Sequence, residues 1–369
     1  MSNSVLNEIL NERNYLSVTK MNDGTEATAA TWQERRRELL ELLMEHSYGY
    51  TPNVEVTVSG TSRGFGRYTC AGKCTEELVD VVYKTVHGEG VIPIQIFTPI
   101  GVAKPPVMLH IAFGEAPHRY IPVEEIVDRG YALVVVDYQK MVNDNHYGDY
   151  SDGIAAHFGT TKDRQPTEWG KIGMWAWGAS RILDYLITEK SDLLDTANVA
   201  VIGHSRLGKT ALWCAAQDER FAAAISNNSG YGGAASSKCG EGERVADFLR
   251  VGSWDWYCEN FKKYGGELED SKPYDQSFLL ALIAPRYLLV GSAELDRGAD
   301  PKSEFLTTLH ASRAWEINGA QGLVTDDEMP TPGAFLGEGS VLYHYRLGTH
   351  YLSRDDWAAY MNFLDTKFR

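Results

Sequence analysis

The sequence has few cysteines, no long apolar run and no surplus of positive charge. Its 369 residues include five cysteines, which are Cys70, Cys74, Cys214, Cys239 and Cys258. Cys70 and Cys74 lie close together, but no second close Cys/His pair accompanies them, so we expect reduced structural thiols and no metal site. No stretch of about 18 apolar residues occurs, so no membrane-spanning helix is predicted.

The balance of charge excludes a further class of protein. The formal net charge at pH 7 is −15, whereas a nucleic-acid-binding protein needs a basic face that displaces counterions from phosphates. Hydrophobic residues make up 43% and charged residues 23% of the chain, which is enough for a large core and unlike a disordered chain. We therefore expect a globular protein that binds neither nucleic acid nor membrane.

The beginning of the sequence shows no basic segment followed by an apolar segment and a small-residue cleavage site. As written, the chain is therefore expected to be cytoplasmic, or secreted if a signal peptide was removed from it. The sequence leaves open whether the protein is a monomer or a homo-oligomer.

The apolar pattern predicts helices first, then antiparallel strands, then strands that are buried on both faces. Alternating residues predict antiparallel strands at 54–59, 78–85 and 92–98. Nearly continuous apolar runs predict buried strands at 107–112 and 131–136. Further strands are expected at 199–203, 222–226, 286–292 and 341–345, and helices at 32–40, 123–128, 169–190, 207–216, 302–317 and 354–368.

The alternation of strands with helices predicts right-handed crossovers and a mostly parallel sheet. We expect an α/β fold, in which a mixed, mostly parallel sheet lies between helices as a three-layer sandwich. No Pro/Gly/Ser-rich linker divides the chain. The predicted organisation is an N-terminal helical extension at 1–50 packed on a catalytic domain at 51–369.

The segment around Ser205 carries the clearest signal of chemistry. An apolar strand ends at Gly203-His204, Ser205 follows, and a helix begins at once with Arg206-Leu207-Gly208-Lys209. A serine on such a tight strand-to-helix turn presents its hydroxyl above the sheet, next to the helix N-terminus where an oxyanion is stabilised. The spacing is Gly-x-Ser-x-x-Gly and not the commoner Gly-x-Ser-x-Gly, so the alternative is a serine that only caps the helix.

Two cations in the first helical turn oppose the helix dipole. Arg206 and Lys209 are unfavourable there unless they interact with an anionic group. The alternative is that both are solvated surface charges.

A nucleophilic serine needs a base and an acid that orients the base, and on this fold they follow in the order Ser, acid, His. The strand at 286–292 ends before Glu294 and Asp296, so Asp296 is the predicted acid and Glu294 the alternative. His350 lies on the loop between the last predicted strand and the last helix. The sequence therefore predicts a serine hydrolase of the α/β-hydrolase fold with Ser205, His350 and Asp296 as its triad.

Seven segments of the chain together form a specific pattern, which are Trp169–Gly178, Gly203–Lys209, Asp218–Phe221, Ser226–Gly230, Ala284–Arg286, Ala299–Pro301 and Arg346–His350. With these segments, the chain from about residue 45 onward resembles the bacterial type of glucuronoyl esterase, carbohydrate esterase family 15.

The resemblance implies hydrolysis of glucuronoyl esters of xylan-derived saccharides through an acyl-enzyme, without a metal or an organic cofactor. By this resemblance, Arg206 would help to build the oxyanion hole. Lys209 would bind sugar hydroxyls, and Glu243 falls near a position with the same task.

The chain departs from the family pattern at two positions. Many fungal members carry the triad acid as Glu where this chain has Asn228, and an amide cannot stabilise an imidazolium in the same way, so the acid is expected from the later loop. Members commonly place a tryptophan against the sugar where this chain has Gly298, which puts the preference for the methylated uronate in doubt.

Three other functions are compatible with the same sequence. The nearest is an acetyl (xylan) esterase or another small-ester carbohydrate esterase with the same triad. The others are a non-catalytic carbohydrate-binding descendant of the fold and a peptidase.

Overall fold

The computed structural model describes residues 4–64, 66–158, 164–238 and 240–369. In this part of the chain, eleven strands form one sheet. The strands are β1 (Thr57–Ser62), β2 (Arg67–Thr69), β3 (Cys74–Thr85), β4 (Gly88–Pro99), β5 (Pro106–Ala112), β6 (Ala132–Asp137), β7 (Asp195–His204), β8 (Ala223–Asn227), β9 (Tyr287–Ala293), β10 (Phe335–Leu336) and β11 (Val341–Arg346).

Helices alternate with these strands. The α-helices are α1 (Val5–Arg13), α2 (Trp32–Leu43), α3 (Val123–Asp128), α4 (Gly153–Phe158), α5 (Lys171–Glu189), α6 (Arg206–Gln217), α7 (Val245–Val251), α8 (Gln276–Ala281), α9 (Pro301–Ala311), α10 (Arg313–Ile317) and α11 (Arg354–Phe368). Shorter helical turns are η1 (Met44–Tyr48), η2 (Cys70–Gly72), η3 (Tyr138–Lys140), η4 (Ser253–Trp256), η5 (Glu259–Tyr264) and η6 (Glu269–Ser271).

The sheet has the order β1-β3-β4-β6-β5-β7-β8-β9-β11-β10, with β2 paired to β3. From β6 to β11 neighbouring strands are parallel, while β1 to β4 are antiparallel and β4 pairs antiparallel with β6. The chain runs outward from β5 to β6 and then back across β5 to β7. Such a reversal leaves a crevice at the carboxyl ends of the strands, where ligands bind in open α/β sheets.

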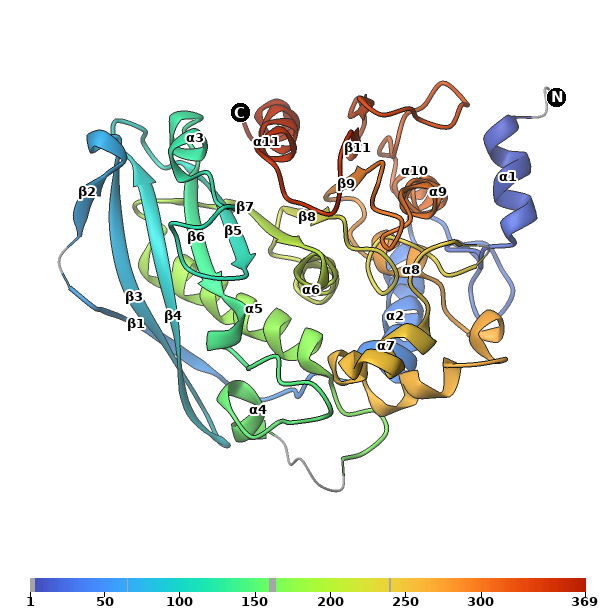
Figure 1. Ribbon diagram of the computed structural model, residues 1–369, viewed down its shortest axis with the longest axis horizontal. Helices are drawn as coiled ribbons and strands as arrows, with labels where there is room; N and C mark the ends of the chain where they lie inside the picture. Colours follow the sequence, from blue (N-terminus) through green and yellow to red (C-terminus); the bar gives the residue numbers. More distant parts are fainter. Residues whose placement is uncertain (1–3, 65, 159–163, 239) are drawn as a thin grey trace.

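The central strands are buried on both faces, because alternate side chains enter two different cores. Val107, Leu109 and Ile111 of β5 belong to the core beneath α5 and α6. Met108 of the same strand belongs to the core beneath α3 and α11. Figure 1 shows α3 and α11 on one side of the sheet and α5 and α6 on the other. This three-layer α/β-hydrolase arrangement confirms the predicted fold class.

The N-terminal segment contacts helix α6 and the loop that follows β8. The Arg36 guanidinium donates to the carbonyl of Ala216 at the end of α6. The Tyr48 hydroxyl donates to the Gly232 carbonyl at 2.9 Å, and the Tyr48 ring stacks on Trp213 with ring centroids 4.2 Å apart. These contacts join residues before 50 to the same core as α5 and α6. The division of the chain at residue 50 stays a prediction.

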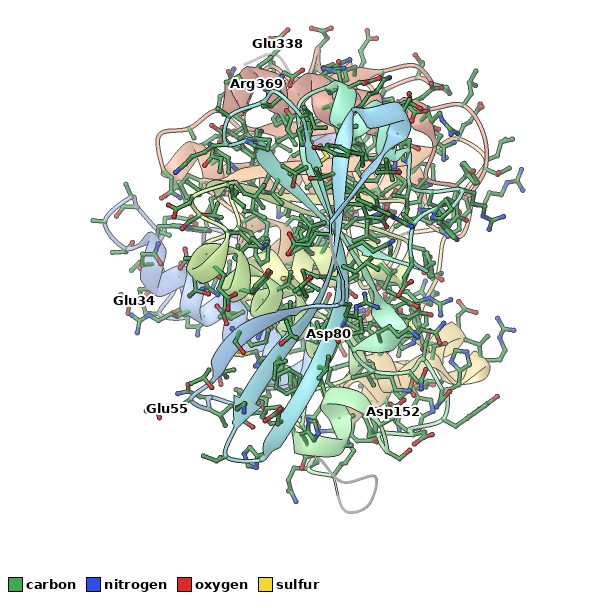
Figure 2. The ribbon with its side chains drawn as sticks, turned by 90° about the vertical axis from the view of Figure 1, so that its left-hand side faces the viewer. Glu34, Glu55, Asp80, Asp152, Glu338 and Arg369 are labelled. Atoms are coloured by element: carbon green, nitrogen blue, oxygen red, sulfur yellow. The ribbon has the colours of Figure 1, made fainter. Side chains whose placement is uncertain are left out.

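The antiparallel end of the sheet forms a long twisted ribbon (Figure 2). Exposed acidic side chains such as Glu34, Glu55 and Glu338 lie at the outside of the molecule in this view. They contribute to the net negative charge of the sequence. Within the described residues, no helix combines the length and the apolar character that crossing a membrane requires.

One predicted strand is displaced in the structure, and one predicted helix is divided. The first strand lies at Thr57–Ser62 and not at 54–59. The helix expected at 302–317 is divided at Ser312, whose hydroxyl donates to the Thr308 carbonyl at 3.1 Å and accepts from the amide of Leu323 at 2.9 Å. A serine that bonds to the backbone in this way competes with the regular helical pattern, so the helix breaks there.

Four of the five cysteines lie in the described part of the chain. Cys70, Cys74, Cys214 and Cys258 are free thiols there, and all except Cys70 are buried. Burial raises the pKa of the Cys258 thiol to about 11, so this thiol stays protonated at neutral pH. Cys239 lies outside the described residues.

Candidate active site

Ser205 occupies the turn between β7 and α6, at the carboxyl edge of the sheet. Its backbone has φ 59° and ψ −128°, and its side chain makes no capping hydrogen bond to the helix. A Cβ on Gly203 would lie 2.0 Å from the Leu207 carbonyl oxygen, so only glycine permits the turn to close this tightly. A non-glycine residue held at positive φ marks a backbone that the surrounding structure constrains. Ser205 therefore occupies the N-cap position of α6, but its side chain does not cap the helix.

His350 and Asp296 lie side by side on two neighbouring loops. Asp296 follows β9 and His350 follows β11, and these strands are paired in parallel. His350 Nδ1 is 2.6 Å from Asp296 Oδ2. Because Nδ1 is occupied by the carboxylate, Nε2 is the ring nitrogen left for proton transfer.

The carboxyl group of Asp296 is surrounded by donors. Its Oδ2 also accepts from the side-chain amide of Asn228 at 2.8 Å, and its Oδ1 accepts from the Ala299 amide at 3.3 Å. Burial acts to raise the pKa of Asp296, but the hydrogen bond and charge of His350, together with Asn228, outweigh burial and hold this pKa below its usual value. Asp296 is therefore ionised at neutral pH.

Ser205, His350 and Asp296 line one cavity of about 210 Å³. The other residues that line it are Asn228, Ser229, Glu243, Gly298 and Ala299. Among the described residues, no hydrogen bond joins the Ser205 hydroxyl to the imidazole. Such bonds are commonly long or poorly aligned before substrate binds. The cavity thus holds all three residues that the sequence predicted as a triad.

The alternative acid, Glu294, lies apart from this cavity. Its side chain is exposed and it does not line the cavity. Its amide donates to the Arg346 carbonyl at 3.0 Å, which fixes the start of the loop. The geometry therefore favours Asp296 as the partner of His350.

His204, next to Ser205, has a different environment. It is buried, its Nδ1 lies 2.7 Å from Asn227 Oδ1, and its ring centroid lies 4.5 Å from that of His350. Burial and the nearby His350 lower the pKa of His204 to about 3. His204 is therefore neutral near pH 7 and supports the His350 ring by packing.

The Arg206 side chain is held by an anion that belongs to the protein. Its guanidinium forms an ion pair with Asp144, whose side chain is 4% exposed, and lies 4.6 Å from the ring centroid of Trp256. The indole of Trp256 donates to the same carboxylate at 2.8 Å. The backbone amide of Arg206 is the first of the helix and has no partner within it, so it can face an oxyanion.

Lys209 is buried and is fully engaged inside the protein. Its ammonium donates to the carbonyls of Ser229 and Tyr231 at 2.6 and 2.7 Å, and to Glu243 Oε2 at 3.1 Å. These three acceptors match its three N–H donors. Glu243 is the partner that lines the cavity with Ser205 and His350, and its side chain is 40% exposed.

Asn228 and Gly298 both line the cavity. Asn228 stands at positive φ, and its side-chain amide donates to Asp296. An acidic side chain at position 228 would place a second negative charge next to the Asp296 carboxylate, which holds His350. Gly298 carries no side chain, and a Cβ built on it would meet only Asp296 Oδ1, at 3.8 Å.

Asp144, Trp256 and Glu304 were not predicted from the sequence. The two cations in the first turn of α6 were a signal that anions lay near, but these anions come from loops that are distant along the chain. Glu304 is fully buried, and its Oε1 accepts from the amides of Ser229 and Gly230 at 2.9 and 3.0 Å. No local pattern distinguishes it from an ordinary helical glutamate.

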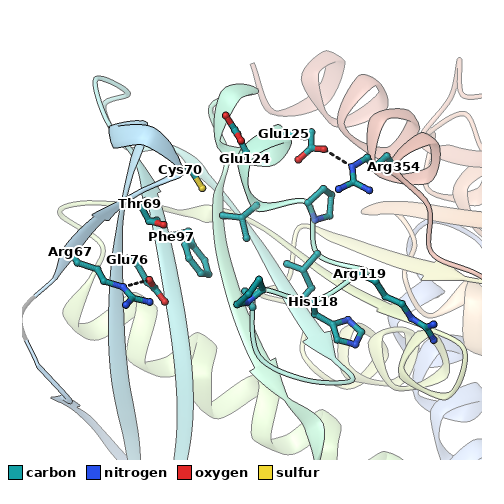
Figure 3. A pocket seen from close by; sticks show the side chains of 15 residues that line it. Arg67, Thr69, Cys70, Glu76, Phe97, His118, Arg119, Glu124, Glu125 and Arg354 are labelled. Atoms are coloured by element: carbon teal, nitrogen blue, oxygen red, sulfur yellow. Dashed lines mark hydrogen bonds and ion pairs between the residues drawn. The ribbon is translucent and has the colours of Figure 1, made fainter.

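A larger cavity of about 560 Å³ lies elsewhere, between β2, β3, β4 and α3 (Figure 3). Neither Ser205, His350 nor Asp296 lines it. Two of its arginines form ion pairs within the protein, Arg67 with Glu76 and Arg354 with Glu125, each at 2.5 Å. The predicted triad therefore lines the smaller cavity at the carboxyl ends of the strands and not the larger one.

The strand order and the serine turn define the chain as an α/β-hydrolase. The family model described as "Glucuronyl esterase, fungi" matches residues 85–319. The chain is also 31% identical to "Carbohydrate esterase MZ0003" from an unknown prokaryotic organism, over 94% of this chain and 87% of that protein. The chain therefore belongs to the glucuronoyl esterase family, carbohydrate esterase family 15, and is a carboxylic ester hydrolase.

Solved structures agree with this assignment. A glucuronoyl esterase from Solibacter usitatus is 33% identical, with a TM-score of 0.87 over 96% of this chain and 98% of that chain. A structure described as a promiscuous CE15 esterase from a marine bacterial metagenome is 30% identical, with a TM-score of 0.85 over 95% and 96% of the two chains.

Proposed function

We propose that the protein hydrolyses glucuronoyl esters of xylan-derived saccharides, with Ser205 as nucleophile, His350 as base and Asp296 as the acid that orients it. The observation that carries the proposal is the single cavity that holds the Asp296–His350 pair and the Ser205 turn. The names of the related proteins supply the substrate class.

The first half of the reaction forms an acyl-enzyme. The Ser205 hydroxyl oxygen attacks the uronate carbonyl carbon, and Nε2 of His350 takes its proton. The negative charge that develops on the carbonyl oxygen faces the Arg206 amide, and the positive end of α6 stabilises it. The ester bond then breaks, and His350 returns the proton to the departing alcohol.

The second half releases the uronate. Water replaces the alcohol and gives a proton to His350, and the resulting hydroxide attacks the acyl carbon. The Ser205 oxygen leaves and recovers the proton from His350. Asp296 remains ionised throughout and stabilises the imidazolium through Nδ1, as its lowered pKa allows.

We assign Glu243 to the hydroxyl groups of the uronate ring, because its carboxylate lines the cavity and is partly exposed. Lys209 fixes the orientation of that carboxylate, and it joins the sugar contact when one of its three hydrogen bonds is exchanged for a substrate hydroxyl. The Arg206 guanidinium, held by Asp144, supports the oxyanion site from the side.

Kinetics on matched esters test the proposal. Methyl glucuronate, methyl galacturonate and acetylated xylo-oligosaccharides separate a glucuronoyl esterase from an acetyl esterase, the alternative that a promiscuous relative makes relevant. We expect the glucuronate ester to have the highest kcat/KM. Ser205→Ala and His350→Ala should each lower kcat by about 10⁵-fold or more, because triad members act as a unit. A Ser205→Ala variant that keeps a tenth of the activity would refute the proposed nucleophile.

A further inference from the structure

Cys70 and Cys74 lie at the two ends of the turn between β2 and β3. Thr69, the residue before Cys70, is the register partner of Cys74 in this antiparallel pair of strands. Neighbouring Cα atoms are ~3.8 Å apart along a chain and ~4.5–5.5 Å apart across such a pair. The Cα atoms of Cys70 and Cys74 are therefore about 6 Å apart, within the range of ~4.4–6.8 Å that a disulfide spans.

The two side chains enter the same layer of the core. Cys74 is fully buried in the core beneath α3 and α11, and Cys70 packs against that core from its edge. Burial, followed by the charge of Cys70 and a hydrogen bond with the Cys70 thiol, raises the pKa of Cys74 to about 12. The two thiols are therefore neighbours on one face of the sheet.

The backbone of the turn has an uncommon conformation. Cys70 and Ala71 have φ values of 50° and 53°, and Gly72 follows with φ 84°. Consecutive residues other than glycine stay at positive φ only where the surrounding structure fixes them. Here the Lys73 amide donates to the Cys70 carbonyl at 3.0 Å, and the Ile100 amide donates to the Lys73 carbonyl at 2.8 Å. The turn therefore keeps the two cysteines close before any bond joins them.

A small reagent can reach one of the two thiols. Cys70 is partly exposed and lines the cavity of about 560 Å³ between β2, β3, β4 and α3 (Figure 3). Cys74 is not exposed and does not line this cavity. Cys214 and Cys258 are also buried, and their thiols donate to backbone carbonyls. Among the described cysteines, an oxidant therefore meets Cys70 first.

We propose that Cys70 and Cys74 are a redox pair, which a low-molecular-weight disulfide such as oxidised glutathione converts into an intramolecular disulfide. First the Cys70 thiolate attacks one sulfur of glutathione disulfide, whose S–S bond breaks and releases one glutathione. The Cys74 sulfur then attacks the Cys70 sulfur of the mixed disulfide and releases the second glutathione. Two protein thiols are oxidised, one glutathione disulfide is reduced to two thiols, and the two protons pass from the protein to glutathione.

Proximity favours the second step. The raised pKa of Cys74 makes its thiolate scarce at neutral pH, but the attack takes place within one turn, where a well-oriented group reacts as if at very high concentration. The mixed disulfide also removes the Cys70 charge that opposes ionisation of Cys74. The disulfide closes a turn that is already tied to α3, because Lys73 forms ion pairs with Glu124 and Asp128 at 2.7 and 2.8 Å.

Peptide mapping tests the proposal, because Lys73 separates the two cysteines. Trypsin cleaves after Arg67, Lys73 and Lys84, so a disulfide between Cys70 and Cys74 joins peptides 68–73 and 74–84. The protein is incubated with oxidised glutathione, its remaining thiols are alkylated in denaturant, and the digest is analysed by mass spectrometry. The joined peptides should exceed glutathionylated peptide 68–73 by at least about tenfold, and dithiothreitol should separate them. Neither thiol lines the cavity that holds Ser205, so the result does not depend on the ester substrate.

Three variants complete the experiment. Cys70→Ser should abolish the joined peptides and leave Cys74 without glutathione, because Cys74 is buried. Cys74→Ala should leave glutathione on Cys70 as a stable mixed disulfide. Cys239→Ser is the matched control, because it removes a thiol and keeps both members of the pair, so its digest should equal that of the wild type.

Thermal unfolding shows whether each variant is folded, and Cys70→Ser decides alone if the change at the buried Cys74 prevents folding. Separate, alkylated peptides from the oxidised wild type would overturn the inference. Glutathione that stays on Cys70 in the wild type would do the same, because Cys74 would then not reach the mixed disulfide. Joined peptides that are lost in Cys239→Ser would assign the disulfide to a different pair and also overturn it.

Discussion

Two buried carboxyl groups lie on either side of the Asn228–Gly230 turn, and they differ in what surrounds them. Asp296 accepts from His350 and Asn228, and its pKa is held below the usual value. Glu304 accepts from two backbone amides and from the Ser292 hydroxyl, none of which carries a charge.

Burial decides the ionisation of Glu304. It raises the pKa of Glu304 to about 8, and the negative charge of Asp296 acts in the same direction, although the bonds to Ser292 and the amides of Ser229 and Gly230 oppose it. Neutral donors cannot offset full burial of a carboxylate, whereas an imidazole that can become positive offsets the partial burial of Asp296. The same turn therefore lies between an ionised carboxylate next to His350 and a largely neutral carboxyl group next to Ser292.

The largest effect that tests this contrast comes from Asp296→Asn. The amide keeps the size of the side chain but removes the charge that stabilises the imidazolium, so kcat should fall by about 10⁴-fold. Steady-state kinetics on methyl glucuronate measure it, with thermal unfolding as a check that the variant is folded.

Glu294→Gln is the matched control, because it makes the same chemical change on an exposed neighbour outside the cavity. Its kcat should stay within about twofold of the wild type, as expected for a surface change. If Glu294→Gln lost activity and Asp296→Asn kept it, the acid would have been assigned to the wrong residue.

A smaller effect is expected from Asn228→Asp. It replaces a donor to Asp296 with a second carboxyl group at 2.8 Å, so the pKa of Asp296 should rise and the pair should share a proton. We expect kcat/KM to fall about tenfold near pH 6 and to recover partly at higher pH, where both groups ionise. A pH profile parallel to that of the wild type would show that Asn228 does not set the ionisation of Asp296.

Much of the fold follows from the sequence because its signals are local. The predicted bounds of α3 and α11 agree with the structure, since each helix has its own apolar face and ends. The edge strand β1 was displaced by three residues, because a half-exposed alternating segment packs equally well in more than one register and only pairing with β3 fixes it. Ser205 could be predicted from the sequence because a glycine, the serine and the start of a helix lie within a few residues of one another.

The remainder of the site depends on contacts between distant segments. Asp296 and His350 were predicted from their places after consecutive parallel strands, and the structure brings them together. The ion pair of Arg206 with Asp144 has no local signature, because it forms only when separate segments of the chain meet.

The smallest effect concerns stability and comes from Glu304→Gln. A carboxyl group whose pKa is raised in the folded state binds a proton there that the unfolded chain has released, so its contribution to stability is full below pH 4.5 and is lost as pH rises toward 8. Over that interval the wild type should lose up to about 1.4 kcal/mol of unfolding free energy per pH unit from this group, and Glu304→Gln should remove that slope.

Asp296 acts in the opposite direction, since its lowered pKa gives stability that is present above pH 3.8 and lost as pH falls through its folded value. Urea unfolding of both proteins from pH 5 to 8 separates the two groups, and equal slopes in wild type and variant would show that Glu304 is ionised in the folded protein.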